Sequence, residues 1–275
     1  MMKIFSIGDM VNISFLDWSF SIHSVFKEVI NLETQYGIVS FVLKSIGGGP
    51  NNIVVDSLYE NFDSFVFKKE IKFDLSNVPM YDSTFHFCNA DKIYLMNNIY
   101  KLEYILINES NSKSAAFLLD EKRLENFKTP LEINLARRIQ IGFQKLLNFD
   151  ISAVKTLKGL GYGLTPQGDD LIDGFIAALF FYETCFNIST YRLRKEIYML
   201  ALTNNKLSNT FLYYTSRGLF YERFKNVLLS LVSGENIEHT VKSMLAFGET
   251  SGADILTGFL KGIKILLEGG SALCQ

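Results

Sequence analysis

Cysteine is scarce in this sequence of 275 residues, which contains Cys88, Cys185 and Cys274 and no CxxC pair. The number is odd and the three positions lie far apart. This usage argues against a disulfide framework and a structural zinc site, and it is typical of a reducing compartment. The sequence therefore predicts a cytoplasmic protein.

A strong charge of either sign is also missing, because 27 Lys and Arg face 29 Asp and Glu for a formal charge of −2. Such a balance provides no general attraction to nucleic acid or to an anionic membrane. The apolar run 175–182 is far shorter than the roughly 20 residues that span a bilayer. The N-terminal stretch lacks the basic and long apolar regions of a signal peptide. We expect neither a nucleic-acid nor a membrane partner.

Several catalytic signatures are absent as well. The sequence has no GxSxG and no Cys–His signature, which disfavours covalent hydrolase chemistry. No Lys-Ser or Lys-Thr follows a glycine-rich loop, so a classical P-loop is excluded. The three histidines, His23, His86 and His239, have no metal-ligand spacing.

Up to about residue 120 the apolar residues mostly recur with a period of two, as in half-buried strands. The clearest case is 65–75, where Phe and Ile alternate with Lys, Glu and Asp. Similar short runs begin at Tyr36, Asn52, Thr84, Lys101 and Ala115. Many short strands separated by turn residues predict an antiparallel sheet or a small barrel.

From residue 129 onward the period is helical. A charged stretch, 120–128, reads as a connector, and Thr129-Pro130-Leu131-Glu132 has the composition of a capping box with proline at the first helical position. Candidate helices cover about 131–147, 168–185, 190–203, 206–217, 219–232, 236–247 and 253–268. The predicted fold class is α+β, with a β-rich domain over 1–125 and an α-helical domain over 126–275.

The least ordinary segment is the glycine-rich stretch 159–174, GLGYGLTPQGDDLIDG. Glycines at alternate positions permit positive φ angles, and a loop that leads into a helix presents free N–H groups able to hold an anion. Asp169, Asp170 and Asp173 crowd this helix start, and no Lys or Arg lies within the stretch. Three carboxylates repel one another unless a cation, a proton or a substrate donor compensates them.

The pattern returns near the C-terminus. Aligned on Asp170 and Asp254, the segment GDDLIDGF matches GADILTGF, and small residues follow each aspartate at intervals of four. We expect the two helices to pack through these small-residue stripes and to bring both loop-plus-aspartate ends to one pocket. Helix capping alone is the alternative, since Ser251 to Asp254 is itself an S-x-x-D box; both interpretations can hold together.

These motifs carry a resemblance to a known family. The stretch 159–174 fits GxGxGLTPxGDDxxxG, and 248–254 fits GxTSGxD, with Ala253 where the family often has Trp. Ser208 followed by Gly218 and Glu222 is a weaker match. The chain resembles the AllH-like proteins, long catalogued as a domain of unknown function. That family is associated with a subunit of oxamate carbamoyltransferase in anaerobic allantoin breakdown.

The resemblance implies transfer of a carbamoyl group between oxalurate and phosphate, giving oxamate and carbamoyl phosphate, with other carbamoyltransferase subunits as partners and a small anionic substrate. Such a transfer passes through a tetrahedral oxyanion, which N–H donors stabilise, and a carboxylate can exchange a proton with the reacting nitrogen. The candidate catalytic residues are Asp169, Asp170 and Asp254. The candidate substrate-binding residues are Gly161, Gly163, Thr165, Gly168, Asp173, Ser208, Thr250, Ser251 and Gly252. Mg²⁺ is one way to compensate the acidic groups beside phosphate, although the sequence defines no full ligand set.

Two further functions stay open at this point. One is a non-catalytic assembly or ligand-binding subunit, which binds an anion without transforming it. The other is a phosphotransferase that uses a magnesium nucleotide at the aspartate cluster.

Overall fold

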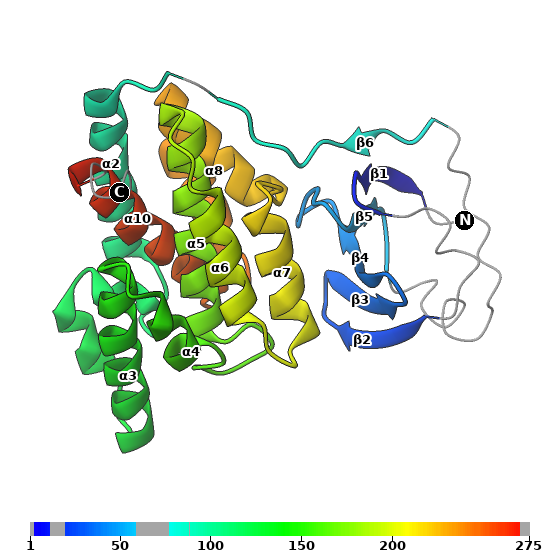
Figure 1. Cartoon of the computed structure of the whole chain (residues 1–275). Helices are drawn as coiled ribbons and strands as arrows, with labels where there is room; N and C mark the ends of the chain where they lie inside the picture. Colours follow the sequence, from blue (N-terminus) through cyan, green and yellow to red (C-terminus); the bar gives the residue numbers. More distant parts are fainter. Residues whose placement is uncertain (1–2, 12–19, 59–76, 88, 270–275) are drawn as a thin grey trace. The chain divides into compact units, whose positions relative to one another are not determined.

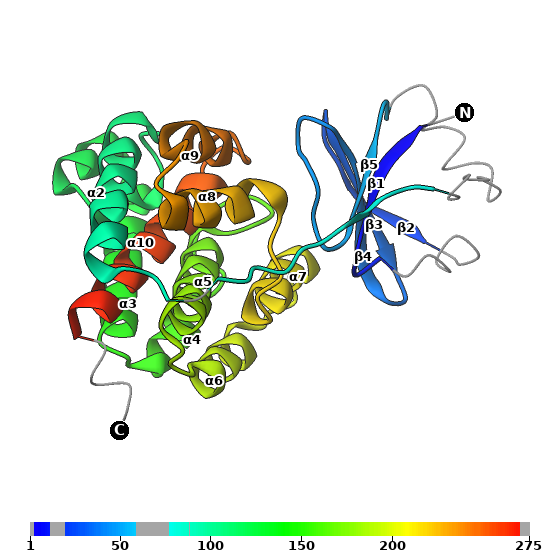
Figure 2. The ribbon, with the colours of Figure 1, turned by 90° about the horizontal axis from the view of Figure 1, so that it is seen from above.

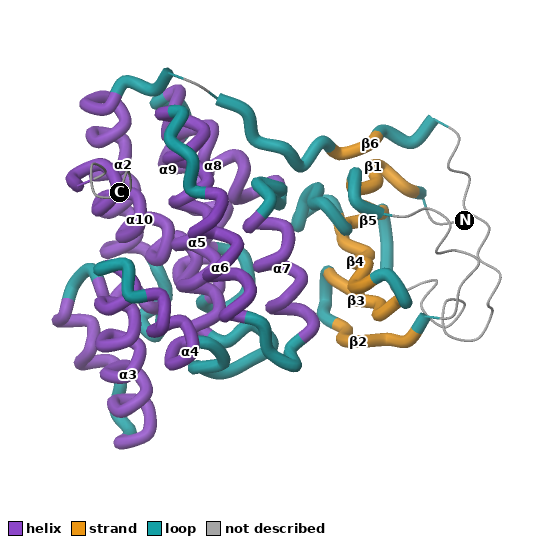
Figure 3. The backbone as a smooth tube through the Cα atoms, viewed as in Figure 1, coloured by secondary structure: helices purple, strands orange, loops and turns teal. Residues whose placement is uncertain are grey.

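The structure is a computed structural model that describes residues 3–11, 20–58, 77–87 and 89–269. Its contacts divide the chain into two compact units. A β unit comprises the described residues up to Phe85 together with Leu219–Lys225, and a helical unit comprises His86–Gly218 and the residues from Asn226 onward. The division into separate domains near residue 125 stays a prediction. Figure 3 shows how strands and helices segregate along the chain, which is therefore α+β, as predicted.

The β unit contains one sheet with the strand order β2-β3-β4-β5-β1-β6. The strands are β1 (Ile4–Gly8), β2 (Ser21–Val25), β3 (Val29–Thr34), β4 (Gly37–Leu43), β5 (Asn52–Val55) and β6 (Met80–Tyr81). The pairs β2–β3, β3–β4 and β1–β5 are antiparallel, whereas β4–β5 and β1–β6 are parallel. The predicted sheet is confirmed, but it is mixed rather than antiparallel. Its core is built from Leu32, Phe41, Ile53 and Val55 with their neighbours.

The segment Leu219–Lys225 belongs to the β unit although it lies between two helices in the sequence. The Glu222 N–H donates to the Gly48 carbonyl, and the Gly48 N–H donates to the Glu222 carboxylate. The Phe220 N–H donates to the Ser83 carbonyl, while the Tyr81 hydroxyl donates to the Phe220 carbonyl. These bonds attach the segment to the glycine-rich turn after β4 and to the strand-like stretch after β6.

The helical unit is built from α-helices of 4 to 20 residues and short 3₁₀ turns. The described helices are α2 (Lys92–Glu109), α3 (Pro130–Leu147), α4 (Val154–Leu157), α5 (Gln167–Phe186), α6 (Tyr191–Ala201), α7 (Lys206–Ser216), α8 (Glu222–Ser233), α9 (Ile237–Leu245) and α10 (Ser251–Gly269). The 3₁₀ turns are η2 (Ala115–Leu118), η3 (Glu121–Asn126) and η4 (Ile151–Ala153); α4 is a single turn that continues η4, and α8 starts within the β unit. None of the described helices combines the length and the apolar character needed to cross a membrane.

The capping box that opens α3 is confirmed. The Glu132 N–H donates to the Thr129 hydroxyl oxygen over 3.2 Å, and the Thr129 N–H donates to the Glu132 carboxylate over 2.9 Å. Pro130 occupies the first helical position, where its missing N–H would have no partner in the helix. The other candidate helices also match observed helices within a few residues.

Two expected strands are wrong. The run from Lys101 lies in α2, and the run from Ala115 forms η2. The buried residues of α2 include Leu95, Leu102 and Leu106, spaced by seven and four, so the helical period is clear only over the full 18 residues. The run from Thr84 contributes an isolated bridge between Thr84 and Leu219, and the expected strand 65–75 lies outside the described residues.

Helix α5 is buried on nearly its whole circumference, from Gln167 to Cys185. It contacts α10, α7 and α6 within the helical unit, and Figures 1 and 2 show it among these helices. A helix that is apolar on all sides is expected in the interior of a helical unit rather than at its surface. This position places the start of α5, with its aspartates, inside the protein.

Candidate functional site

Helices α5 and α10 pack against each other so closely that their backbones touch. A Cβ added to Gly174 would lie 2.0 Å from the carbonyl oxygen of Ile255, and one added to Gly258 would lie 2.3 Å from that of Leu171. Only glycine allows such an approach at these two positions. The prediction that the two helices pack through their small-residue stripes is thus confirmed, and Figures 1 and 2 show the two helices as neighbours.

This packing brings the two helix starts together. The hydroxyl oxygens of Thr165 and Ser251 are 2.8 Å apart and share a hydrogen bond. The Gln167 carboxamide donates to the Asp254 carboxylate over 3.2 Å. Residues from the two motifs, more than 80 positions apart in the sequence (251 − 165 = 86), therefore contact each other directly.

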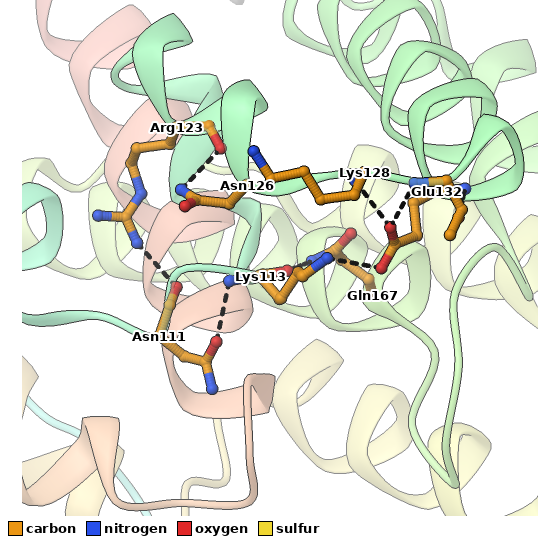
Figure 4. Close-up of polar contacts among 8 residues, drawn as sticks. Asn111, Lys113, Arg123, Asn126, Lys128, Glu132 and Gln167 are labelled. Atoms are coloured by element: carbon orange, nitrogen blue, oxygen red, sulfur yellow. Dashed lines mark hydrogen bonds and ion pairs between the residues drawn. The ribbon is translucent and has the colours of Figure 1, made fainter.

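Gln167 also connects this place to a third segment. Its carboxamide donates to the Lys113 carbonyl over 3.2 Å, beside the ion pair of Lys113 with Glu132 at 2.6 Å (Figure 4). The Ala115 N–H donates to the same Asp254 oxygen. Sequence reasoning missed these contacts. Gln167 stood at a variable position of the motif, and the stretch from Ala115 was expected to be a strand.

Asp170 and Asp254 are the carboxyl groups at the meeting point, with 4% and 0% of their surface exposed. Burial, followed by the negative charge of Asp254, raises the pKa of Asp170 well above its usual value, and the Ser251 hydroxyl opposes this shift. Burial raises the pKa of Asp254 to about 7, against the lowering effects of Ala115, Thr250 and Gln167. Two carboxyls that repel each other in a buried place favour retaining a shared proton.

Asp169 and Asp173 lie one helical turn apart on α5. Hydroxyl groups of α7 influence the pKa of each. Burial raises the pKa of Asp169, opposed by a 2.7 Å hydrogen bond from the Gly159 N–H and by the Ser208 hydroxyl. Burial raises the pKa of Asp173 to about 7, opposed by the Thr215 hydroxyl. The Ser208 hydroxyl lowers the pKa of Asp169, although no well-aligned hydrogen bond joins the two side chains. The four aspartates thus form two neighbouring groups, Asp170 with Asp254 and Asp169 with Asp173, and the charges of Asp169 and Asp173 also raise the pKa of Asp170.

Several backbone N–H groups at the two helix starts already have partners within the protein. The Gly168 N–H donates to the Leu160 carbonyl over 2.7 Å, and the next two N–H groups of α5 donate to the Pro166 carbonyl. The Gly252 N–H donates to the Phe247 carbonyl over 2.9 Å. These amides hold the loops in place and are not free to bind an anion.

The loop 159–165 has the backbone that its glycines predicted. Gly159, Gly161 and Gly163 have φ angles of +74°, +130° and +84°. A Cβ at Gly159 or Gly163 would meet no heavy atom within 4 Å, so the loop borders open space there. The Asn205 side chain holds its far end by donating to the Leu164 carbonyl over 2.6 Å.

The aspartates do not form a metal centre of direct ligands. Within the described residues, no group of three or more His, Cys, Asp or Glu side chains is arranged to hold a metal ion. No chemical step is therefore derived through Mg²⁺.

The structure brings most of the expected site residues together. Residues of the motifs 159–174 and 248–254 meet at the starts of α5 and α10, and Ser208 lies beside Asp169. Glu222, from the weaker match, belongs instead to the β unit, where it bonds Gly48.

Comparison with known families gives one match. Residues 157–263 fit the family model described as oxamate carbamoyltransferase subunit AllH. The matched range contains both glycine–aspartate motifs and Ser208, and it supports the AllH-like assignment. No solved structure matches the chain significantly.

Proposed function

We propose that this AllH-like chain is a subunit of a cytoplasmic carbamoyltransferase and contributes acid–base residues to a site shared with other subunits. The reaction is transfer of a carbamoyl group between oxalurate and phosphate. The observation that carries the proposal is the direct contact between the two motif-bearing helix starts, through Thr165 with Ser251 and Gln167 with Asp254. The family match supports the carbamoyltransferase role.

A phosphate oxygen attacks the carbamoyl carbon of oxalurate, and the bond from that carbon to the oxamate nitrogen breaks. The departing nitrogen takes a proton, so carbamoyl phosphate and oxamate leave. In reverse, the attacking oxamate nitrogen gives up a proton. The pair of Asp170 and Asp254 suits both directions, because burial raises the pKa of both carboxyls and the charge of Asp254 raises that of Asp170 further, so that a proton is retained at this place.

The tetrahedral intermediate needs hydrogen-bond donors for its oxyanion. The amides of Gly161 and Gly163 and the hydroxyls of Thr165, Thr250 and Ser251 are our candidates. The amides of Gly168 and Gly252 have a supporting role here, because each already bonds a carbonyl. Asp169 fixes the glycine loop through the Gly159 N–H and acts as a positioning residue.

The test is Asp170→Asn in the assembled enzyme. General acid–base catalysis typically contributes about 10²–10⁴ in rate, so we expect turnover to fall at least about 100-fold. The melting temperature should stay within a few degrees of the wild-type value, because asparagine has nearly the same size and shape as aspartate. Turnover is measured with carbamoyl phosphate and oxamate.

Glu196→Gln is the matched control, since Glu196 is an exposed carboxylate on α6 outside both motifs. It should leave turnover unchanged. Normal activity in Asp170→Asn would show that the acid–base assignment is wrong.

A non-catalytic ligand-binding subunit is the second candidate. It is favoured by the internal hydrogen bonds that the Asp254 carboxylate accepts from Ala115 and Gln167, which are sufficient for a structural role. It predicts that neutralising either aspartate leaves the turnover of the assembled enzyme intact. No observation favours the magnesium-nucleotide phosphotransferase, because the described residues contain no suitable metal-binding group.

A further inference from the structure

Five buried oxygen atoms at the starts of α5, α7 and α10 have no hydrogen-bond partner. Each belongs to a residue with at most 5% of its surface exposed. They are Oδ2 of Asp169, Oδ2 of Asp170, Oδ1 of Asp173, Oδ2 of Asp254 and Oγ of Ser208. Buried polar atoms are nearly always paired, and an unpaired one is costly. A group of five points to something that pairs with them.

Ser208 contributes one of the five oxygens from a helix that carries none of the four aspartates. It belongs to α7, it has 2% of its surface exposed, and its hydroxyl acts on Asp169 without a formed hydrogen bond. Ser230, by contrast, is a similarly buried serine whose hydroxyl donates to the Val227 carbonyl and shares a hydrogen bond with Thr240. Ser208 is therefore not simply a structural serine of the helical unit.

Positively charged donors are scarce around these oxygens. Among the described residues, Lys158 is the only cation that acts on the pKa values of the four aspartates. Its ammonium group already donates to the Leu200 and Leu202 carbonyls, at 2.9 and 2.8 Å. The N–H groups of Gly168, Asp169 and Asp170 also have partners within the protein. An anionic group would find neither an opposite charge nor a free N–H among these groups.

We propose that these oxygens bind the amino end of the substrate, a carboxamide or ureido NH₂ group. The anionic end is then bound by cationic side chains of another subunit. An NH₂ group brings two hydrogen-bond donors and no negative charge, so it can pair with two of the unpaired carboxyl oxygens without adding to the repulsion between the aspartates. The glycine loop 159–165, with its open border at Gly159 and Gly163, provides the side from which the ligand enters. This inference rests on the proposed carbamoyltransferase function.

The proposed site is tested by measuring the binding of three probes to the full chain in the absence of other subunits: oxamate, oxalate and inorganic phosphate. Oxalate matches oxamate in size but has a second carboxylate in place of the carboxamide. By calorimetry we expect the chain to bind oxamate at least tenfold more tightly than oxalate, and to show no response to phosphate. The assembled enzyme should bind phosphate as well.

Two variants and a control locate the binding. Ser208→Ala and Thr215→Val should each raise the Kd for oxamate roughly three- to tenfold, as expected for loss of one hydrogen bond or its support. Ser230→Ala should leave this Kd unchanged, although it removes a hydroxyl that is equally buried.

Three results would overturn the proposal: oxalate or phosphate bound by the chain as tightly as oxamate, no binding of oxamate at all, or an unchanged Kd in both variants. These failures are distinct from failure of the proposed function. Loss of turnover in Asp170→Asn would still support the acid–base role if the chain preferred oxalate.

Discussion

At the scale of single residues, the carboxyl groups of Asp173 and Asp254 have pKa values of about 7 because burial disfavours their charged forms. The helix dipole acts in the opposite sense on Asp254, but it contributes only about 0.3–1 kcal/mol to a charge in a first turn. One pKa unit corresponds to about 1.4 kcal/mol. Loss of hydration therefore outweighs the dipole, and simple capping does not account for these side chains.

Stability should consequently depend on pH in a definite sense. A carboxyl with a raised pKa contributes stability that is fully present below its ordinary pKa of 3.8 and is lost as pH rises through about 7. The free energy of unfolding of the wild type should fall between pH 5 and pH 8 from this cause. Asp254→Asn should show a smaller fall, measured by urea denaturation at each pH.

The variant Glu196→Gln, at an exposed position, is again the control. Its free energy of unfolding should depend on pH as that of the wild type does. If Asp254→Asn shows the same dependence, the Asp254 carboxyl does not titrate in this range.

The sequence predicted that Asp170 and Asp254 lie near each other, because they occupy equivalent positions in the two motifs. Gln167 and Ala115 could not be predicted in the same way. Their contacts with Asp254 depend on where a 3₁₀ turn lies in space, and no local pattern of residues encodes that position.

At the scale of elements, the pairing of α5 with α10 is determined by glycine. Gly174 and Gly258 face backbone atoms of the opposite helix, and spacing by four places such residues on one face of a helix. This pairing was predictable for that reason. The helix α2 was not, since the short window from Lys101 resembles a strand and its helical period emerges only with Leu95 and Leu102.

Gly258→Ala should therefore be strongly destabilising. Its methyl group would lie 2.3 Å from the Leu171 carbonyl oxygen, so the helices must separate. Overpacking of a core typically costs about 1–3 kcal/mol, and we expect the free energy of unfolding to fall by about 2 kcal/mol or more in urea.

Gly269→Ala is the matched control on the same helix. A Cβ there meets no heavy atom within 4 Å, and alanine is the better helix former. It should be neutral or slightly stabilising. Equal effects of the two substitutions would show that helix propensity, and not the contact with α5, governs Gly258.

At the scale of the whole molecule, the segment Leu219–Lys225 shows what a sequence pattern cannot reveal. It was expected to open a helix, and it does lead into α8, yet its contacts belong to the β unit. Glu222 and Gly48 are 174 positions apart in the sequence, and their bond follows from tertiary structure alone. The mixed direction of the sheet was unpredictable for the same reason, since strand pairing is not local.

Glu222→Ala should loosen this attachment. The Gly48 N–H loses its acceptor, and one hydrogen bond is worth on the order of 1 kcal/mol. We expect hydrogen exchange at Gly48 to accelerate roughly fivefold, while the amide of Ala115 in the helical unit keeps its rate.

Glu235→Ala, at an exposed position, provides the comparison and should change neither rate. Unaltered exchange at Gly48 in Glu222→Ala would mean that other contacts hold the segment.

The close packing of α5 against α10 also affects how the chain folds during its synthesis. Asp170 and Asp254 are 84 positions apart (254 − 170), so α5 is made well before the helix that covers it. At about 5–20 residues per second, a ribosome needs on the order of 4–17 s to add that stretch. Throughout this interval an apolar helix has no permanent neighbour along its glycine stripe. The nascent chain is then most exposed to aggregation, and a chaperone that shields apolar helices should raise the yield of folded protein.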